Sequence, residues 1–205
     1  MLQLEFLPHF SPQFSVLHCR YFYFHYFAGL SVGLKAACEA EAARAASEVI
    51  MNAIKLYRIG HWFYKRRIPI IPRLIYYLIY LIYNASIPMA AEIGEGTKFG
   101  YGGMGVVVHS NCRIGRKVYI AQQVTIGARR APWHGVPVIE DNCFIGVGAK
   151  LLGPIHIGTG SVIGANAVVV HDVPPHSVVA GVPARVIRKD IKIEDYYDWS
   201  ALWGR

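Results

Sequence analysis

Residues 139–169 read IEDNCFIGVGAKLLGPIHIGTGSVIGANAVV, and a large apolar side chain recurs there at every sixth residue. The same spacing of six is found upstream, interrupted at two places. A fixed period of this kind predicts a repeat architecture, in which each unit stacks on its neighbours. The twelve positions are Ile93, Phe99, Val108, Ile114, Ile120, Ile126, Ile139, Ile145, Leu151, Ile157, Ile163 and Val169.

The residues around each apolar position indicate what one repeat looks like. The residue two places earlier is small or β-branched, so both side chains lie on one face of a strand. The third residue after it is a turn former in most repeats, and Gly or Asn there tolerates positive φ. Each hexad is therefore a short strand followed by a turn, and three hexads close one triangular coil. Twelve hexads predict a mainly β chain with a parallel β-helix of about four coils. The inward small-residue positions also predict buried core thiols at Cys112 and Cys143.

The period breaks at two places, where extra residues are expected to loop out. The first break is the glycine-rich segment Gly100–Gly105, and the second lies between Ile126 and Ile139. A rigid coil cannot absorb extra residues, and functional side chains concentrate on loops that a scaffold carries. Both loops are therefore candidate parts of an active site.

The chain before the repeats divides into two parts. Residues 1–50 are expected to be a poorly defined extension, and 51–91 a helical region. In the latter, one helix is predicted to end at Pro69 and Pro72, and a second to run from Arg73 to Ser86. The repeats then occupy 92–188 and a tail 189–205.

The second predicted helix carries tyrosines at 76, 77, 80 and 83. Two interpretations remain open for it. The helix packs against neighbouring subunits, or residues 61–86 contact a membrane peripherally, with Lys65–Arg67 facing anionic lipid.

Composition narrows the class of partner and the compartment. The net charge is +8, but only 17% of residues are charged, so the basic balance reflects few acids. This favours a phosphate-bearing small ligand or an anionic surface, and no nucleic acid is expected as a partner. Four cysteines without a CxxC motif predict free thiols in a reducing compartment. We expect a cytoplasmic protein, or one that is peripheral at the inner face of the membrane.

Four motifs give the chain a family resemblance over about residues 51–189. They are FGYGGMGVVVH (99–109), VTIG (124–127), IGVGAKLLG (145–153) and VPPHSVVAGVPAR (173–185). With them the chain resembles the serine acetyltransferase-like branch of the hexapeptide-repeat acyltransferases. The resemblance implies a left-handed β-helix, a homotrimer, and active sites at subunit boundaries with acetyl-CoA lying along the coils. It also implies acetyl-CoA-dependent O-acetyl transfer, with no metal.

The acceptor remains open because the chain departs from that family in two respects. Serine acetyltransferases carry an Asp-His pair where this chain has Tyr101 and Gly102. The tail ends in LWGR, unlike the peptide that docks on the partner enzyme of cysteine biosynthesis. The short architecture is similar to enzymes of polysaccharide biosynthesis that acetylate sugars. L-Serine and a sugar hydroxyl are therefore both retained as acceptors.

Acetyl transfer from a thioester to a hydroxyl requires a base and a donor for the developing oxyanion. Histidine is the natural base at neutral pH. We associate His134 and His109 with the two breaks, and we expect coil stacking and the subunit boundary to bring them together. His156 is expected on an outer strand face with a structural role. The predicted substrate contacts are Tyr101, Trp133 and Arg130.

Coenzyme A carries phosphates, which gives the basic balance a use. The backbone at Ala128, Val147 and Ala165 matches family positions where amides meet the pantetheine arm. Basic side chains that could meet the phosphates stand in or just after the repeats: Arg129, Arg130, Lys150, Arg185, Arg188 and Lys189. Of these, Lys150, Arg185 and Lys189 are the predicted cofactor contacts.

Two other classes of function fit a trimeric β-helix. His171 and His176 form a His-x4-His pair, which a zinc carbonic anhydrase-like site would use together with a third histidine. A catalytically silent scaffold is the remaining alternative.

Overall fold

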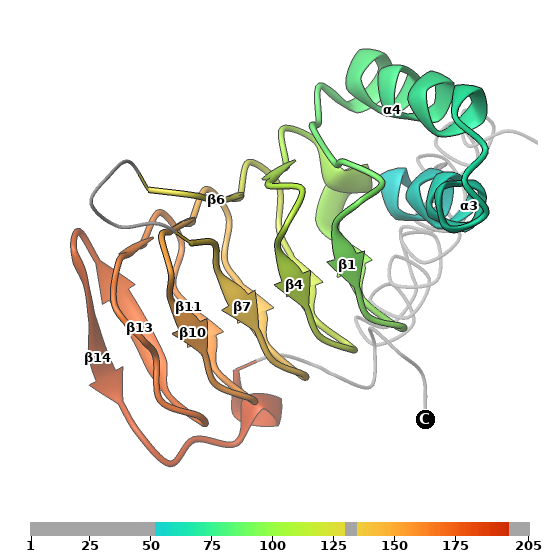
Figure 1. Cartoon of the computed structure of the whole chain (residues 1–205). Coiled ribbons are helices and arrows are strands. Elements are labelled where there is room, and N and C mark those ends of the chain that lie inside the picture. The colour runs from blue at the N-terminus through green and yellow to red at the C-terminus, as the bar shows by residue number, and fades with distance from the viewer. Residues whose placement is uncertain (1–51, 130–134, 197–205) are drawn as a thin grey trace, which may run out of the picture. The chain divides into compact units, whose positions relative to one another are not determined.

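The computed structural model describes residues 52–129 and 135–196, and these form a triangular solenoid preceded by two helices (Figure 1). Each side of the triangle is a sheet of very short strands, and we name the three sheets A, B and C. Sheet A holds β3 (Val107–Val108), β6 (Thr125–Gly127), β9 (Lys150–Leu152) and β12 (Val168–Val169). Sheet B holds β1 (Glu92–Ile93), β4 (Arg113–Ile114), β7 (Val138–Ile139) and β10 (His156–Ile157). Sheet C holds β2 (Lys98–Phe99), β5 (Tyr119–Ile120), β8 (Phe144–Ile145), β11 (Val162–Ile163), β13 (Val178–Gly181) and β14 (Ala184–Arg188).

Strand pairing follows the hexad period. All pairs between coils are parallel, and the predicted apolar residues stand opposite one another, as Ile114 does to Ile139 and Ile126 to Leu151. A left-handed parallel β-helix of about four coils was predicted, and it is confirmed.

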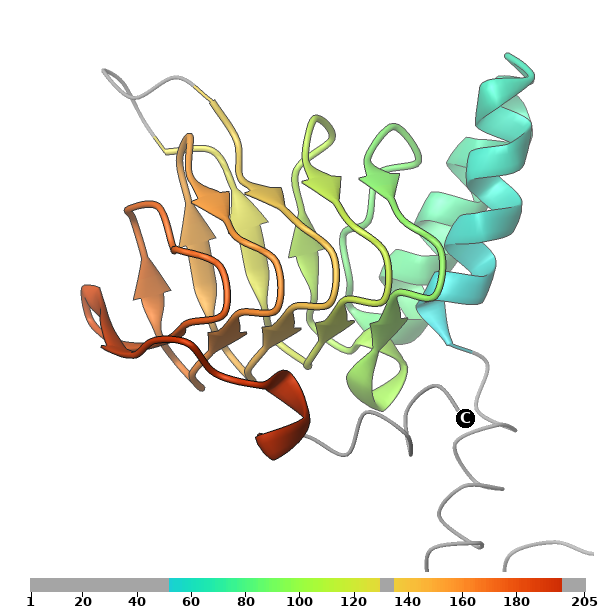
Figure 2. The same ribbon diagram turned by 90° about the horizontal axis from the view of Figure 1, so that it is seen from below.

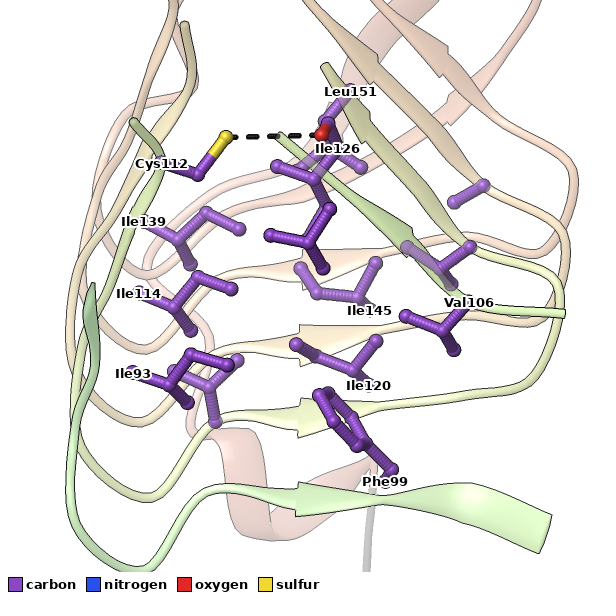
Figure 3. Close-up of a cluster of buried hydrophobic side chains, with 14 of the residues drawn as sticks. Ile93, Phe99, Val106, Cys112, Ile114, Ile120, Ile126, Ile139, Ile145 and Leu151 are labelled. Atoms are coloured by element: carbon purple, nitrogen blue, oxygen red, sulfur yellow. Dashed lines mark hydrogen bonds between the residues drawn. The ribbon is translucent and has the colours of Figure 1, made fainter. Parts of the chain in front are cut away.

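The core consists of the side chains that the period selects. All twelve apolar positions are buried, and so are the small residues two places before them, including Ala149 and Ala167. Figure 3 shows the resulting ladders, in which Ile93, Ile114 and Ile139 stack along one side of the interior. Because each layer contacts the layers next to it, the core is continuous along the solenoid.

The corners between strands adopt the backbone that the turn residues predict. Asn142, Gly148, Gly160 and Asn166 all have positive φ, between 54° and 68°. The first break differs from the expectation of a protruding loop. It forms a short 3-10 turn, η1 (Gly100–Gly103), and the backbone N–H of Gly105 donates to the carbonyl of Tyr83 at 3.0 Å.

Helix α3 (Ala53–Lys65) covers the first coil. The side chain of Asn52 caps it by accepting the N–H of Ile54 at 3.2 Å. Its inward face anchors to the coil through hydrogen bonds, because Tyr57 donates to the carbonyl of Ala91 and Arg58 to those of Ile93 and Gly94. Burial raises the pKa of Tyr57 to about 12, so its hydroxyl stays a donor.

Helix α4 spans Ile70–Tyr83 and begins before the predicted start at Arg73. The prediction that Pro72 lies outside the helices was wrong. Pro72 lies in the first turn of α4, where backbone N–H groups have no partner within the helix and proline is tolerated. Ile79 and Tyr83 form the buried side of α4.

The C-terminal strand and tail close the far end of the solenoid. Strand β14 pairs with β13 in antiparallel direction, and the chain then runs back along sheet C through η2 (Ile193–Asp195), as Figure 2 shows. Ile193 packs on Val162 and Val178, so the tail covers this part of sheet C.

Among the described residues, the helices fall short of the length and apolarity that crossing a bilayer requires.

Candidate functional site

Sheet A lies between the two breaks in the period. The chain runs from sheet C to A to B in each coil, so η1 stands where sheet C meets sheet A, at what we call the C/A corner. The second break follows β6 and stands where sheet A meets sheet B, at the A/B corner. The outward residues of the sheet between them are Val107, Thr125, Gly127, Lys150, Leu152 and Val168.

His109 lies at the A/B corner, directly after β3. Its backbone N–H donates to the carbonyl of Ile126 at 2.8 Å, which places it one coil from Gly127, the last residue before the second break. The expected association of His109 with the first break was wrong, because the width of sheet A separates it from η1. His109 instead shares a corner of the same chain with the loop whose sequence contains His134.

The imidazole of His109 is held in one tautomer. The backbone N–H of Asn111 donates to Nδ1 of His109 at 3.2 Å. A backbone amide can only donate, so Nδ1 accepts and the neutral ring carries its proton on Nε2. The half-exposed ring therefore offers an Nε2–H donor.

The described ends of the second break lie against the following coil. The side chain of Arg129 passes over Gly153, where a Cβ would meet it at 3.3 Å. Gly135 has a φ of 136° and a Cβ there would come within 2.6 Å of Pro154, so the return of the loop requires glycine. The predicted residues Arg130, Trp133 and His134 lie outside the described residues.

The C/A corner carries a second row of predicted residues. Tyr101 is 75% exposed on η1, and the corner continues through hydrogen bonds from Gln123 to Met104 and from Asn166 to Val147. Ala165 lies at the same corner on the next coil, where its backbone nitrogen would be 2.7 Å from a Cβ placed on Gly146. Arg185 ends the row, because β14 pairs it with Ala180 near the turn of the final hairpin.

The remaining predicted cofactor contacts are dispersed. Lys150 points outward on sheet A, and its Nζ donates to the carbonyl of Gln123 at 2.7 Å, toward the C/A corner. Ala128 is exposed at the opposite A/B corner. Lys189 follows the far end of β14, beside Lys192 and Tyr196 on the tail, and does not join the C/A row.

A cleft between α3 and sheet B was not predicted. Its walls include His61, Lys65 and Thr159. Some charged groups around it are paired, as Arg113 is with Glu92 at 3.3 Å and Arg116 with Asp141 at 3.2 Å. The sequence signal that could have indicated it is the charged residue before the apolar position in strands of sheet B, such as Glu92, Arg113 and His156.

His156 conforms to its predicted place on an outer strand face. It is exposed on β10, and its Nε2 lies 3.2 Å from a carboxylate oxygen of Glu140. Glu140 also accepts the backbone N–H of Thr159, and this hydrogen bond links neighbouring coils.

The two core cysteines are inert, as predicted. Cys112 and Cys143 are 1% and 0% exposed, and burial raises their pKa values to about 11 and about 12. Both thiols thus stay protonated near neutral pH and are poor nucleophiles.

His171 and His176 lie at different corners of the last coil. His171 is exposed after β12, at the A/B side, whereas His176 lies over Gly160 beside the tail. Within residues 52–129 and 135–196, no three His, Cys, Asp or Glu side chains gather into a group that could hold a metal ion.

Comparisons with known proteins agree with this architecture. Residues 137–171 match the profile of the family described as bacterial transferase hexapeptide (six repeats). The serine acetyltransferase of Bacillus subtilis is 39% identical over 172 residues, which are 77% of this chain and 78% of that protein. The serine acetyltransferase of Synechococcus elongatus is 37% identical over 160 residues, covering 75% of this chain and 65% of that protein.

Two solved structures are similar to that of this chain. Soybean serine acetyltransferase complexed with serine superposes with a TM-score of 0.60 and 36% identity, covering 66% of this chain and 56% of that chain. A serine acetyltransferase in complex with CoA gives the same TM-score and identity, covering 66% and 55%. This chain thus spans about half of the length of these two structures.

Proposed function

We propose, on the premise that the chain belongs to the serine acetyltransferase family of hexapeptide-repeat transferases, that it transfers an acetyl group from acetyl-CoA to a hydroxyl. The observation that carries the proposal in the molecule itself is His109, which presents Nε2–H beside the base of the loop containing His134. Acetyl transfer requires a base and a donor for the oxyanion, and we propose His134 as the base and His109 as the donor.

The two histidines take different roles in the proposed reaction. The imidazole of His134 removes the proton of the acceptor hydroxyl as its oxygen attacks the thioester carbonyl. His109 donates its Nε2–H to the oxyanion that forms, while its Nδ1 remains bonded to Asn111. When the intermediate collapses, the carbon–sulfur bond breaks and the CoA thiolate takes the proton from His134. The products are the acetyl ester and CoA.

Acetyl-CoA is proposed to lie along the C/A corner. Val147 is half-buried and Ala165 is exposed at this corner, and we propose their backbone as the edge for the pantetheine arm, with Arg185 at its end for the phosphates. Lys150 lies on sheet A beside this edge and adds positive charge. Tyr101, on the first coil of the same corner, then faces the acceptor.

A homotrimer is proposed to complete the site. The C/A and A/B corners of one chain stand on opposite edges of sheet A. We therefore propose that a cofactor at the C/A corner of one chain meets the base at the A/B corner of a neighbouring chain. The tail covers sheet C at Val162 and Val178, which leaves sheet A available for that contact. Light scattering of the purified protein tests this, and a monomer at micromolar concentration contradicts it.

L-Serine is the first proposed acceptor, because the relatives named above are serine acetyltransferases. The second is a sugar hydroxyl of a surface polysaccharide. It is favoured by Tyr101 and Gly102, which stand at the positions of the family's Asp-His pair and offer no ionic partner to an amino acid. CoA release from acetyl-CoA, measured with serine and then with a panel of sugars, distinguishes the two. Release with neither, at any enzyme concentration tested, contradicts the proposed activity.

The proposed location is the cytoplasm, in keeping with the two free buried thiols, Cys112 and Cys143. Contact of residues 61–86 with the inner face of a membrane is retained as part of the proposal. Its surface lies on the two helices rather than on sheet A.

A further inference from the structure

Helix α4 has an apolar stripe that the described part of the chain leaves uncovered. Ile70, Leu74, Tyr77 and Leu81 recur at the spacing that aligns residues on one side of a helix. They are 76%, 68%, 65% and 82% exposed. We call these four residues the α4 stripe. Large apolar side chains gathered on one exposed surface mark an interaction site.

The opposite side of α4 already supplies the contacts that hold the helix to the fold. Ile79 is fully buried and Tyr83 is 6% exposed. The hydroxyl of Tyr76 is hydrogen-bonded to that of Ser86 at 3.0 Å. Two of the four tyrosines expected at a membrane surface, Tyr76 and Tyr83, therefore belong to the packed side. Since folding does not require the stripe to be apolar, its composition needs another explanation.

The charge around the stripe has a single sign. Residues 49–91 contain no Asp or Glu, yet they contain six basic residues, so they account for +6 of the net charge of +8. Arg58 is bound to carbonyls of the first coil, but Lys65, Arg66 and Arg67 are exposed immediately before α4. The remaining two are Lys55 on α3 and Arg73 on α4, both exposed.

Aromatic side chains with polar edges accompany these charges. Trp62 is half-exposed, and the guanidinium of Arg66 lies 3.4 Å from its ring centroid. Tyr77 and Tyr80 are exposed on α4 itself. Indole and phenol rings favour the boundary between lipid headgroups and acyl chains.

We propose that the α4 stripe lies on the surface of an anionic lipid bilayer, with Lys65–Arg67 and Arg73 contacting headgroup phosphates. A helix of 14 residues is about 21 Å long, too short to cross a bilayer but suited to lie in its interface. A second copy of the chain is a poorer occupant, because its own basic residues would face these ones. The first 50 residues contain both acids and bases, so their charge does not favour them as the occupant.

Vesicle sedimentation with the full chain tests the proposal. We expect the protein to bind vesicles of equal parts phosphatidylglycerol and phosphatidylcholine at low ionic strength, and to release on addition of salt. Leu74→Glu with Leu81→Glu should weaken binding at least tenfold. Lys65→Gln with Arg67→Gln should weaken it by about twenty-five-fold, because each basic residue near an anionic surface contributes about fivefold. Vesicles of phosphatidylcholine alone should bind poorly in every case.

Ile187→Glu is the matched control, since Ile187 is also exposed, at 61%, but lies on β14. It should bind vesicles as the unaltered protein does. The proposal is overturned if the unaltered protein does not bind anionic vesicles, or if the Leu74/Leu81 variant binds them equally well. It is also overturned if that variant loses subunits in light scattering, because the stripe is then a protein contact. Lipid binding is measured without acetyl-CoA, so its outcome is independent of the proposed transferase activity.

Discussion

The backbone N–H of Asn111 donates to Nδ1 of His109, at 3.2 Å, and this bond leaves the proton of the neutral ring on Nε2. The bond belongs to the turn that follows β3, where the N–H of Cys112 also returns to the carbonyl of His109 at 3.1 Å. A turn of two residues thus orients the side chain that we propose as the oxyanion donor.

His109→Ala should lower kcat at least tenfold, approaching the 10²–10³-fold that loss of one oxyanion donor typically costs. His109→Gln should recover much of this loss, because the glutamine amide can donate although it cannot act as a base. Steady-state CoA release measures both. If Ala and Gln are equally inactive and the acidic limb of the pH profile disappears in both, His109 is the base.

His134→Ala should lower kcat by about 10² to 10⁴, as loss of a general base does. Its trimer and Tm should be unchanged. His156→Ala is the control, because His156 is exposed and its contact with Glu140 is a surface pair that contributes little. Unchanged turnover in both the His134 and His109 variants would refute the assignment, and Tyr101 would be examined next.

Arg185→Gln should raise the KM for acetyl-CoA without lowering kcat, because Arg185 is proposed to meet phosphates distant from the thioester. Combined with Lys150→Gln the increase should be larger. Acetyl-pantetheine lacks the nucleotide, so the same variants should use it as the unaltered enzyme does. Arg113→Gln, on sheet B, serves as control. An equal loss with both donors would place the effect in folding instead.

Cys112→Ser should destabilise the protein by about 1–3 kcal/mol and leave turnover unchanged, because it buries a hydroxyl in an apolar layer. Urea unfolding followed by circular dichroism measures the loss. The thiol should also react slowly with alkylating reagents near neutral pH until the protein unfolds, since burial raises the pKa of Cys112 to about 11. Rapid alkylation of the folded protein at Cys112 would contradict the burial.

A protein that starts at Met51 should fold and form trimers like the full chain. The truncation keeps Asn52, which caps α3, and every contact between α3 and the first coil. Light scattering and Tm measure the outcome. Loss of the trimer would show that residues 1–50 are a structural domain rather than an extension.

The solenoid could be predicted because its signal is periodic. Apart from the two breaks, each apolar residue of the repeat is followed by another six positions later. The twelve hexads therefore reinforce one another, and a single substitution, such as Phe99 for an aliphatic residue, does not obscure them. The start of α4 was harder to predict, because proline disrupts a helix at most positions and is tolerated only in the first turn, where Pro72 lies. A tail was predicted at 189–205, but its packing on sheet C was not, because Ile191 and Ile193 lie outside the period.

The site could be predicted only as separate residues. His109 is four residues from the first break and 17 from Ile126, yet the parallel pairing of β3 with β6 places it at the second break. Separation in the sequence is therefore a poor guide to which residues share a corner. The neighbour on the next coil is instead found three strands later, as β6 is for β3. The tautomer of His109 depends on one backbone N–H in a turn, and the hexad pattern carries no information about it.

A stack of parallel strands has no intrinsic length, because the edge of its last coil can accept another strand in the same register. Here β14 reverses direction and borders sheet C with an antiparallel strand that carries Arg185 and Arg188. A coil from a second molecule would meet the wrong polarity and two positive charges at that edge, and α3 occupies the opposite end. The hairpin thus acts as a terminator that opposes end-to-end polymerisation of the solenoid into fibres.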